Sequence, residues 1–193
     1  MRHNRSMSSP TADVSVRVAW ADDAQAIARR QVEAWREAYA DVLPAEIMDA
    51  LDADEFARKW AASMDKPGDA RNRVLVALER ATVHGFAVTA PSQDPDADPI
   101  ADGEIVEFIV NADARGAGHG SRLLQACTDT LRADKFTRAT WWVRSTDDAL
   151  RGFVESTGWA PDGAHRELAL DETGESTVKQ VRLHTSLVAD DDA

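Results

Sequence analysis

The residues best suited to chemistry form a glycine-rich turn in the second half of the chain. Its glycines occupy alternate positions: Gly116, Gly118 and Gly120. An apolar segment typical of a buried strand, 103–110, precedes the turn, and an amphipathic segment typical of a helix, 118–133, follows it. Glycine lets a ligand approach the main chain closely, and the first N–H groups of a helix have no partner inside the helix. With Arg115 and the Ser121 hydroxyl beside it, this arrangement predicts a phosphate site.

The spacing of the glycines separates this turn from two better-known phosphate loops. The dinucleotide fingerprint requires G-x-G-x-x-G, whereas the pattern here is Gly116-x-Gly118-x-Gly120. The Walker loop requires glycine, lysine and then serine or threonine, whereas Gly120 is followed directly by Ser121. Taken alone, the turn also fits a plain tight turn without a ligand. The elements around it must decide between these interpretations.

Hydrophobic periodicity predicts the elements that position the turn. Strands are expected at 14–19, 74–78, 83–89, 103–110, 137–143, 165–170 and 178–187. Helices are expected from 24 to a break at Leu43-Pro44, from 45 to 64 with a break near 52–54, at 118–133 and at 147–157. This order predicts a single α/β domain with a mixed central sheet flanked by helices.

The ends of the predicted domain and one long connection are polar. The domain is expected over residues 14–188, between a flexible N-terminal arm, 1–13, and an acidic tail, 189–193. The connection 91–102 holds three prolines and four aspartates, and we expect a mobile loop there.

The acidic composition bears on the partners of the protein. The 193 residues carry a formal net charge of −12, which disfavours nucleic acid and favours a cationic acceptor such as an amine. The one cysteine, Cys127, excludes an intrachain disulfide and a cysteine metal site, and we expect its thiol to be buried on the apolar face of a helix. No apolar run approaches the ~20 residues of a membrane span, and residues 1–11 do not resemble a signal peptide. We expect a cytoplasmic protein with no membrane, nucleic-acid or metal partner, and a homodimer stays open.

Three segments, taken in order, resemble the GNAT superfamily of acetyltransferases. The turn Arg115-Gly-Ala-Gly118-His-Gly120 is similar to the pyrophosphate motif of that family, Gln/Arg-x-x-Gly-x-Gly/Ala. Segment 141–159 looks like a second family segment. Segment 35–44 is similar to a Trp-x-x-x-Tyr-x-x-x-Leu-Pro signature of many bacterial members. The resemblance extends from about residue 16 to residue 187.

The resemblance implies a fold and an acyl donor. In this family two central parallel strands splay apart, and acetyl-CoA lies in the opening. Main-chain groups of three strand residues would pair with its pantetheine arm: Phe108, Ile109 and Val110. The turn would hold its pyrophosphate through Arg115, Gly116, Ala117, Gly118, His119, Gly120 and Ser121. Phe153 would line the thioester end, and Asp147 stands where an asparagine is usual; we expect the His119 side chain to be exposed.

The resemblance also suggests groups for proton transfer. Glu104 occupies the strand position where some members carry their general base, and a carboxylate beside a partly dry cleft can have a raised pKa. Glu107 is the alternative base, although the alternation of a strand would turn it to the opposite face. Val154 replaces the tyrosine that commonly serves as the acid. The acid is therefore either Tyr39, the single tyrosine of the chain, or water.

The predicted activity is direct transfer of an acetyl group from acetyl-CoA to a primary amine. A competing interpretation, prompted by Val154 and Asp147, is an acyl-CoA-binding regulatory module with little or no turnover. The acceptor stays open among small polyamines, antibiotics, amino acids and protein lysines. A nucleic-acid-modifying acetyltransferase is disfavoured by the net charge.

Overall fold

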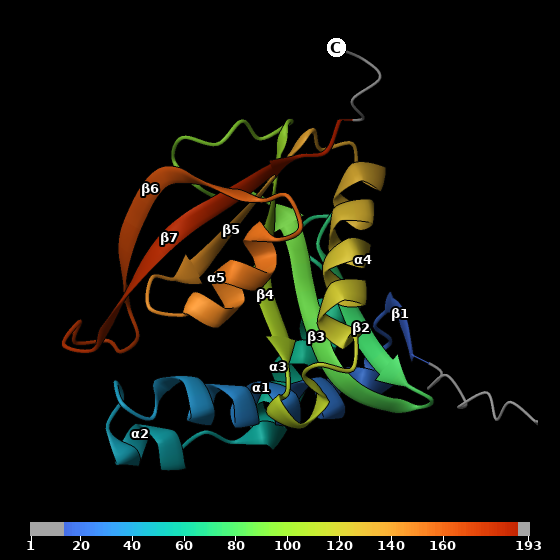
Figure 1. Cartoon of the computed structure of the whole chain (residues 1–193). Helices are drawn as coiled ribbons and strands as arrows, with labels where there is room; N and C mark the ends of the chain where they lie inside the picture. The colour runs from blue at the N-terminus through green and yellow to red at the C-terminus, as the bar shows by residue number, and fades with distance from the viewer. Residues whose placement is uncertain (1–13, 189–193) are drawn as a thin grey trace, which may run out of the picture.

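The computed structural model describes residues 14–188, which form one mixed sheet of seven strands with helices on both faces (Figure 1). The strands are β1 (Val14–Val18), β2 (Arg73–Glu79), β3 (Thr82–Pro91), β4 (Asp102–Val110), β5 (Arg138–Arg144), β6 (Ala160–Ala169) and β7 (Thr177–Ser186). Their order is β1-β2-β3-β4-β5-β7-β6, and only β4 and β5 pair in parallel. The predicted α/β class with a mixed central sheet is confirmed. The predicted arm, 1–13, and tail, 189–193, lie outside the described residues.

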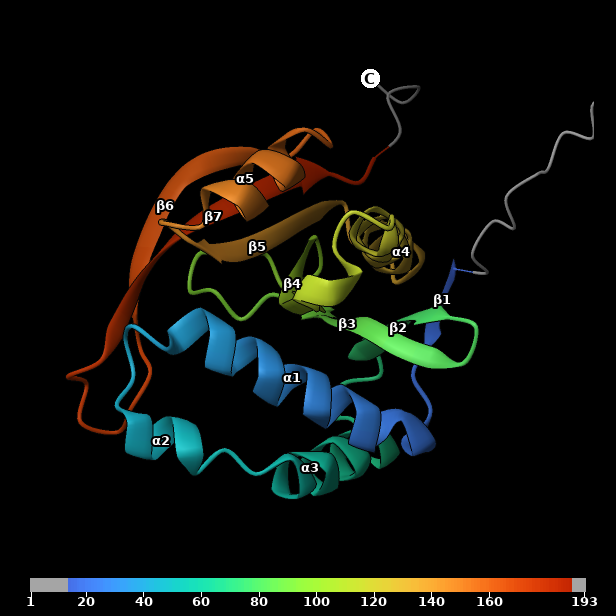
Figure 2. The same ribbon diagram turned by 60° about the horizontal axis from the view of Figure 1, so that its bottom comes forward.

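Helices cover the sheet in two layers (Figure 2). They are α1 (Ala24–Tyr39), α2 (Ala45–Asp49), α3 (Ala53–Asp65), α4 (His119–Ala133) and α5 (Asp148–Glu155), with short 3-10 helices η1 (Ala21–Asp23) and η2 (Ala112–Ala114). The predicted break between α2 and α3 is present, because the Asp52 carboxylate accepts the Asp54 N–H at 2.8 Å and begins a new helix. β6 begins earlier than predicted, since an irregular register around Gly163 interrupts its alternation.

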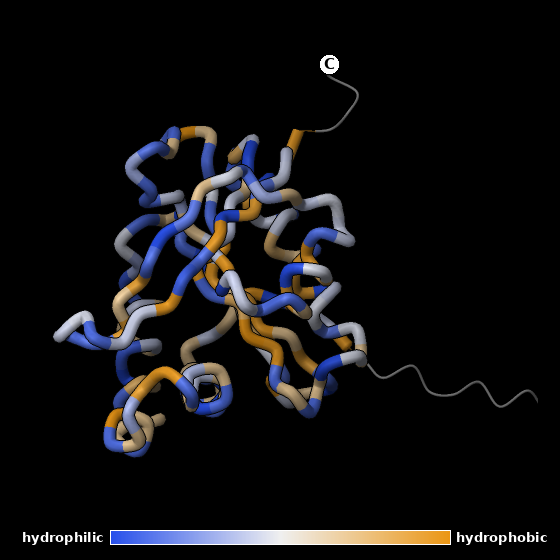
Figure 3. The backbone as a smooth tube through the Cα atoms, turned by 60° about the vertical axis from the view of Figure 1, so that its left-hand side comes forward, coloured by the Kyte–Doolittle hydropathy of each residue, from blue (hydrophilic) through white to orange (hydrophobic). Residues whose placement is uncertain are grey.

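Two apolar clusters hold these layers to the sheet. On one face, α4 contributes its i, i+4 series of Leu123, Cys127 and Leu131 to a core that includes Trp141. On the other face, α1 and α3 cover a second core around Phe86. Figure 3 shows hydrophobic stretches in the centre of the molecule, and others at its periphery. The buried Cys127 thiol is confirmed, and burial raises its pKa.

The two parallel strands separate halfway along their length. β4 pairs with β5 only from Asp102 to Ile105, against Arg138 to Trp141. Both strands continue beyond this ladder, β4 to Val110 and β5 to Arg144. The predicted splay of two central parallel strands is therefore confirmed, and it lies between the α1 layer and the α4 layer.

Candidate active site

The glycine turn connects the end of β4 to the start of α4. The 3-10 turn η2 follows the strand, and Gly118 is the N-cap of α4. Gly116 has a φ of +79° and Gly118 a φ of +86°, which residues with a side chain rarely adopt. The first N–H groups of α4 lack acceptors within the helix and lie at this turn. The turn thus offers unpaired donors and the positive end of a helix dipole to an anion.

Gly120, the second residue of α4, lies beside both β4 and α5. A β-carbon built at Gly120 would be 3.7 Å from Cζ of Phe153 and 3.9 Å from Cγ2 of Val110. Both distances are ordinary van der Waals contacts. Three of the residues that the sequence assigns to the donor site therefore meet around one small gap, which the missing side chain of Gly120 keeps open.

The two polar side chains of the turn point in different directions. Arg115 turns toward α1, where its Nη1 lies 3.2 Å from Oε1 of Glu37 and its Nε donates to the Val110 carbonyl at 3.3 Å. The Arg115 side chain is 59% exposed, so it can reorient toward an anion. Doing so breaks only the exposed ion pair with Glu37, which contributes little to stability. Ser121 is exposed and lines a cavity of about 230 Å³ between α4 and the end of β7.

The expectation that His119 is exposed is wrong. Its side chain is fully buried, its ring stacks on that of His84 with centroids 5.0 Å apart, and its Nε2 lies 3.6 Å from Oε2 of Glu79. The reason is helical spacing, because His119 stands one turn before Leu123 on the buried face of α4. His119 can contribute its main-chain N–H at the turn, while its side chain fastens α4 to the β2–β3 hairpin.

The edge of β4 beyond Ile105 is free to pair with a ligand. On one side β4 pairs with β3 as far as Val110, whereas on the β5 side its ladder ends at Ile105. Phe108 packs against Trp141 with ring centroids 4.8 Å apart, on the α4 side. Ile109 joins the apolar cluster on the α1 side. The predicted strand for the donor arm, 108–110, thus borders the splay.

A β-bulge turns both candidate glutamates to the same face of the sheet. Val88 of β3 pairs with Glu107, and the next residue of β3 pairs with Ile105, so Val106 is an extra residue in β4. Ile105 and Phe108 both pack in the α4-side cluster although three positions separate them. Glu104 and Glu107 consequently share the opposite, α1-facing side. The prediction that strand alternation separates them is wrong, because the bulge shifts the alternation by one residue.

The two glutamates differ in their surroundings. Glu104 lies within the paired part of β4, is 9% exposed and accepts the Ser92 hydroxyl at 3.3 Å. Burial, and then Asp94, raise the pKa of Glu104. Glu107 lies where the splay begins, and burial raises its pKa to about 7, against the opposing effect of the Phe108 N–H. Glu107 therefore changes charge near neutral pH.

Tyr39, the last residue of α1, lies close to Glu107. Burial and the Glu107 carboxylate raise the pKa of the Tyr39 phenol, while the Arg144 guanidinium lowers it. The ring stands edge-on to Trp35, with centroids 6.3 Å apart. The end of α1 thus brings the single phenol of the chain to the splayed ends of β4 and β5. The sequence did not single out Arg144.

The two departures from the family pattern have local structural roles. The Asp147 carboxylate accepts the Leu150 N–H at 3.0 Å and is the N-cap of α5. Aspartate and asparagine are both good N-caps, so the exchange preserves this function. Val154 is fully buried in the α4-side core.

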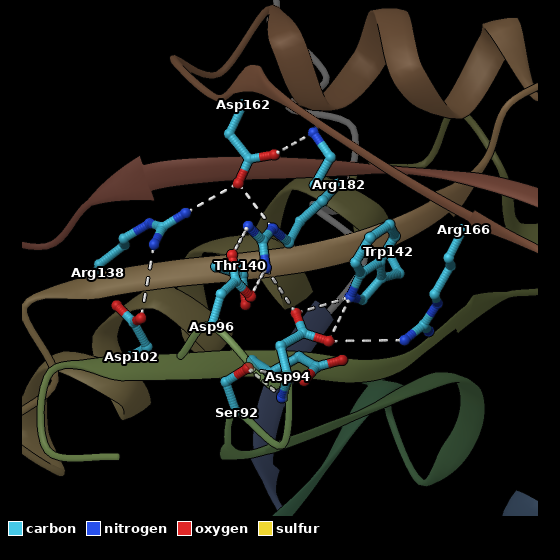
Figure 4. Close-up of polar contacts among 12 residues, drawn as sticks. Ser92, Asp94, Asp96, Asp102, Arg138, Thr140, Trp142, Asp162, Arg166 and Arg182 are labelled. Atoms are coloured by element: carbon cyan, nitrogen blue, oxygen red, sulfur yellow. Dashed lines mark hydrogen bonds and ion pairs between the residues drawn. The ribbon is translucent and has the colours of Figure 1, made fainter. Parts of the chain in front are cut away.

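Figure 4 shows a network of arginines and aspartates. It lies near Glu104, because Asp94 and Arg166 both influence that carboxyl. Arg182 on β7 is 6% exposed and binds Asp94 at 3.0 Å, Asp96 at 2.7 Å and Asp162 at 2.7 Å. The Trp142 indole N–H donates to Asp94 at 2.9 Å. Asp94 and Asp96, in the connection that we expected to be a mobile loop, thus bind side chains of β5 and β7.

Comparisons with known proteins agree with this architecture. Residues 32–159 match the family model described as "Acetyltransferase (GNAT) family". "Uncharacterized N-acetyltransferase YuaI" of Bacillus subtilis (strain 168) is 29% identical over 131 residues, which cover 67% of this chain and 71% of that protein.

Two solved structures have the same fold. An N-acetyltransferase from Staphylococcus aureus Mu50 superposes with a TM-score of 0.70 at 17% identity, over 91% of this chain and 99% of its own. YncA from Salmonella typhimurium, solved with its cofactor acetyl-CoA, gives a TM-score of 0.68 at 19% identity, over 92% and 95%. Among residues 14–188, each helix is too short or too polar to cross a bilayer. The chain therefore belongs to the acetyltransferase (GNAT) family and is an acyl-CoA-dependent acetyltransferase with acetyl-CoA as its donor.

Proposed function

We propose that this acetyltransferase transfers the acetyl group directly to a primary amine, with Glu107 as the general base. The observation that carries the proposal is the bulge at Val106, which turns Glu107 toward Tyr39 at the point where β4 and β5 part. A carboxylate whose pKa is about 7 is well matched to accept a proton near neutral pH. Glu104 is the second candidate, since it shares the same face but lies within the paired ladder.

The donor side of the proposed site uses main-chain groups. Acetyl-CoA supplies the acetyl group as an activated thioester. The N–H groups at the start of α4 would hold its phosphates, and the free β4 edge at Phe108–Val110 would align its arm. Phe153 and Gly120 would bound the gap between these two contacts.

The acceptor side uses side chains. As the amine nitrogen bonds to the acetyl carbon and the carbon–sulfur bond breaks, Glu107 would take the amine proton and the sulfur would gain one. Tyr39 is our candidate for that second proton, because its raised pKa keeps the phenol protonated at neutral pH. The proposed acceptor is a small amine rather than a nucleic acid, in keeping with the net charge of −12.

The competing interpretation, a binding module with little turnover, was prompted by Val154 and Asp147, which fill the core and cap α5. Val154 cannot donate a proton, so turnover requires another acid. Tyr39 and Glu107 offer a phenol and a carboxylate on the α1-facing side instead.

The test measures release of the free thiol of coenzyme A from acetyl-CoA with a panel of primary amines, and the mass of the acetylated amine. Glu107→Gln should lower kcat by about 100-fold or more while the Kd for acetyl-CoA stays constant. Glu104→Gln, on the same strand and face, is the matched control and should change kcat little. The opposite pattern moves the base to Glu104. Thiol release that never depends on an amine overturns the proposal.

A further inference from the structure

Arg144 is a cationic group at the acceptor side of the splay. It is the last residue of β5, beyond the final β4–β5 pair at Trp141. Strand alternation puts it on the same face as Trp142, whose indole meets the Asp94 loop, and Thr140. That is the face to which the bulge turns Glu107.

The end of α1 fixes the position of Arg144. Its Nη1 donates to the carbonyl of Ala38, and its guanidinium carbon lies 5.4 Å from the centroid of the Tyr39 ring. Glu107 and Arg144 both act on the Tyr39 phenol, with opposite signs. One carboxylate and one guanidinium thus influence the same phenol.

Unlike the neighbouring arginines, Arg144 has no carboxylate beside it, in the described part of the chain, to balance its charge. Three other arginines on β5, β6 and β7 each have a carboxylate within 4 Å: Arg138, Arg166 and Arg182. Within residues 14–188, no carboxylate lies within 4 Å of the Arg144 guanidinium, although the residue is half-buried. The Ala38 carbonyl uses one of five N–H donors, so a planar fork is left that suits a carboxylate.

We propose that Arg144 binds a carboxylate of the acceptor, so that the acceptor is an amino acid whose amine faces Glu107. This inference rests on the proposed function, because it identifies the amine that the same site takes. A cation and a carboxylate near Tyr39, on one face of the sheet, match an acceptor that carries both charges. A polyamine would bring a second positive charge toward Arg144, and like charges repel.

Arg144 also stabilises the end of α1, where a cation near the last carbonyls is favourable. A purely structural role predicts no discrimination between acceptors. The decisive readout is therefore a ratio between two substrates rather than the activity itself.

The experiment compares kcat/KM for free amino acids and for the matching amino-acid amides, which keep the amine and lose the negative charge. The wild type should prefer the acid by about 10-fold to 100-fold. Arg144→Gln should raise KM for the acid, leave the amide nearly unchanged and bring the ratio close to one. Arg144→Lys keeps the cation but not the fork, and should retain part of the preference.

Arg36→Gln is the matched control. Arg36 also donates to main-chain carbonyls, those of Met48 and Leu51, and its loss should leave the acid-to-amide ratio unchanged. A wild-type ratio near one overturns the inference without any variant, as does a ratio that survives Arg144→Gln. If amines are acetylated without this preference, the proposed function still stands. If no amine is acetylated, both fail.

Discussion

Substituting Gly120 should change stability and donor affinity in opposite directions. The residue lies in the first turn of α4, and its φ is not among the positive values found at Gly116 and Gly118. A β-carbon there meets Phe153 at 3.7 Å and Val110 at 3.9 Å, so alanine fits without displacing either neighbour. Replacing a helical glycine by alanine at such a site stabilises a protein by about 0.4–1 kcal/mol.

The same β-carbon enters the gap beside the helix N-terminus, where the donor phosphates would approach the main chain. Loss of one hydrogen bond to a charged group weakens binding by about 1.5–3 kcal/mol, or roughly 10-fold to 150-fold. Gly120→Val adds two further methyl groups to the gap and should weaken binding more. Gly116→Ala is the contrasting variant for stability. The φ of +79° at Gly116 strains any side chain by about 1–2 kcal/mol, although no atom lies within 4 Å of the added β-carbon.

The assay pairs chemical denaturation without ligand and isothermal calorimetry with acetyl-CoA. Gly120→Ala should unfold at a higher denaturant concentration than the wild type and bind acetyl-CoA more weakly. A folded Gly120→Val protein with the wild-type Kd would refute the assignment of the turn to the donor phosphates.

Four other predictions concern proton transfer and the ion-pair network. Because a base must be deprotonated and the pKa of Glu107 is about 7, kcat/KM should fall as the pH drops below 7, and a pH profile of Glu107→Gln should lack this limb. Tyr39→Phe should lower kcat by about 10-fold or more and spare the Kd for acetyl-CoA, whereas steady-state kinetics that show no change would assign the second proton to water. Arg182→Leu should destabilise the fold by about 3–5 kcal/mol in denaturant, because it leaves buried carboxylates such as Asp94 without their cation. Although burial alone would raise the pKa of Asp162, its hydrogen bonds from Ala164 and Arg182 lower it, so the stability that this carboxylate adds should be lost as acid titration passes its folded pKa.

Features encoded in adjacent residues could be predicted from the sequence. The glycine turn, the break before α3 and the buried Cys127 depend on local spacing, and the structure contains all of them. The burial of His119 was predictable too, because the i, i+4 series with Leu123 and Cys127 was visible in the sequence. His119 was nevertheless expected to be exposed, because it lies within the phosphate-turn motif.

Features that depend on two distant segments could not be predicted in this way. The bulge at Val106 exists only in the register between β3 and β4, and it reverses which face Glu107 occupies. Asp94 and Asp96 acquire a partner in Arg182, which lies more than 80 positions later in the chain. Strand periodicity carries no information on either pairing.

The final turns of α1 contact both sides of the splay, and this gives the helix a thermodynamic role. Glu37 binds Arg115 at the donor turn, and the next residue, Ala38, binds Arg144 at the acceptor side. A phosphate that draws Arg115 away from Glu37 changes the charge at the end of a helix that also orients Arg144. Any coupling through α1 must be reciprocal, so bound donor would alter acceptor affinity by the same factor as bound acceptor alters donor affinity. Because the Glu37–Arg115 pair is exposed, the coupling free energy is on the order of 1 kcal/mol or less, so each substrate should change the affinity for the other by no more than about 5-fold.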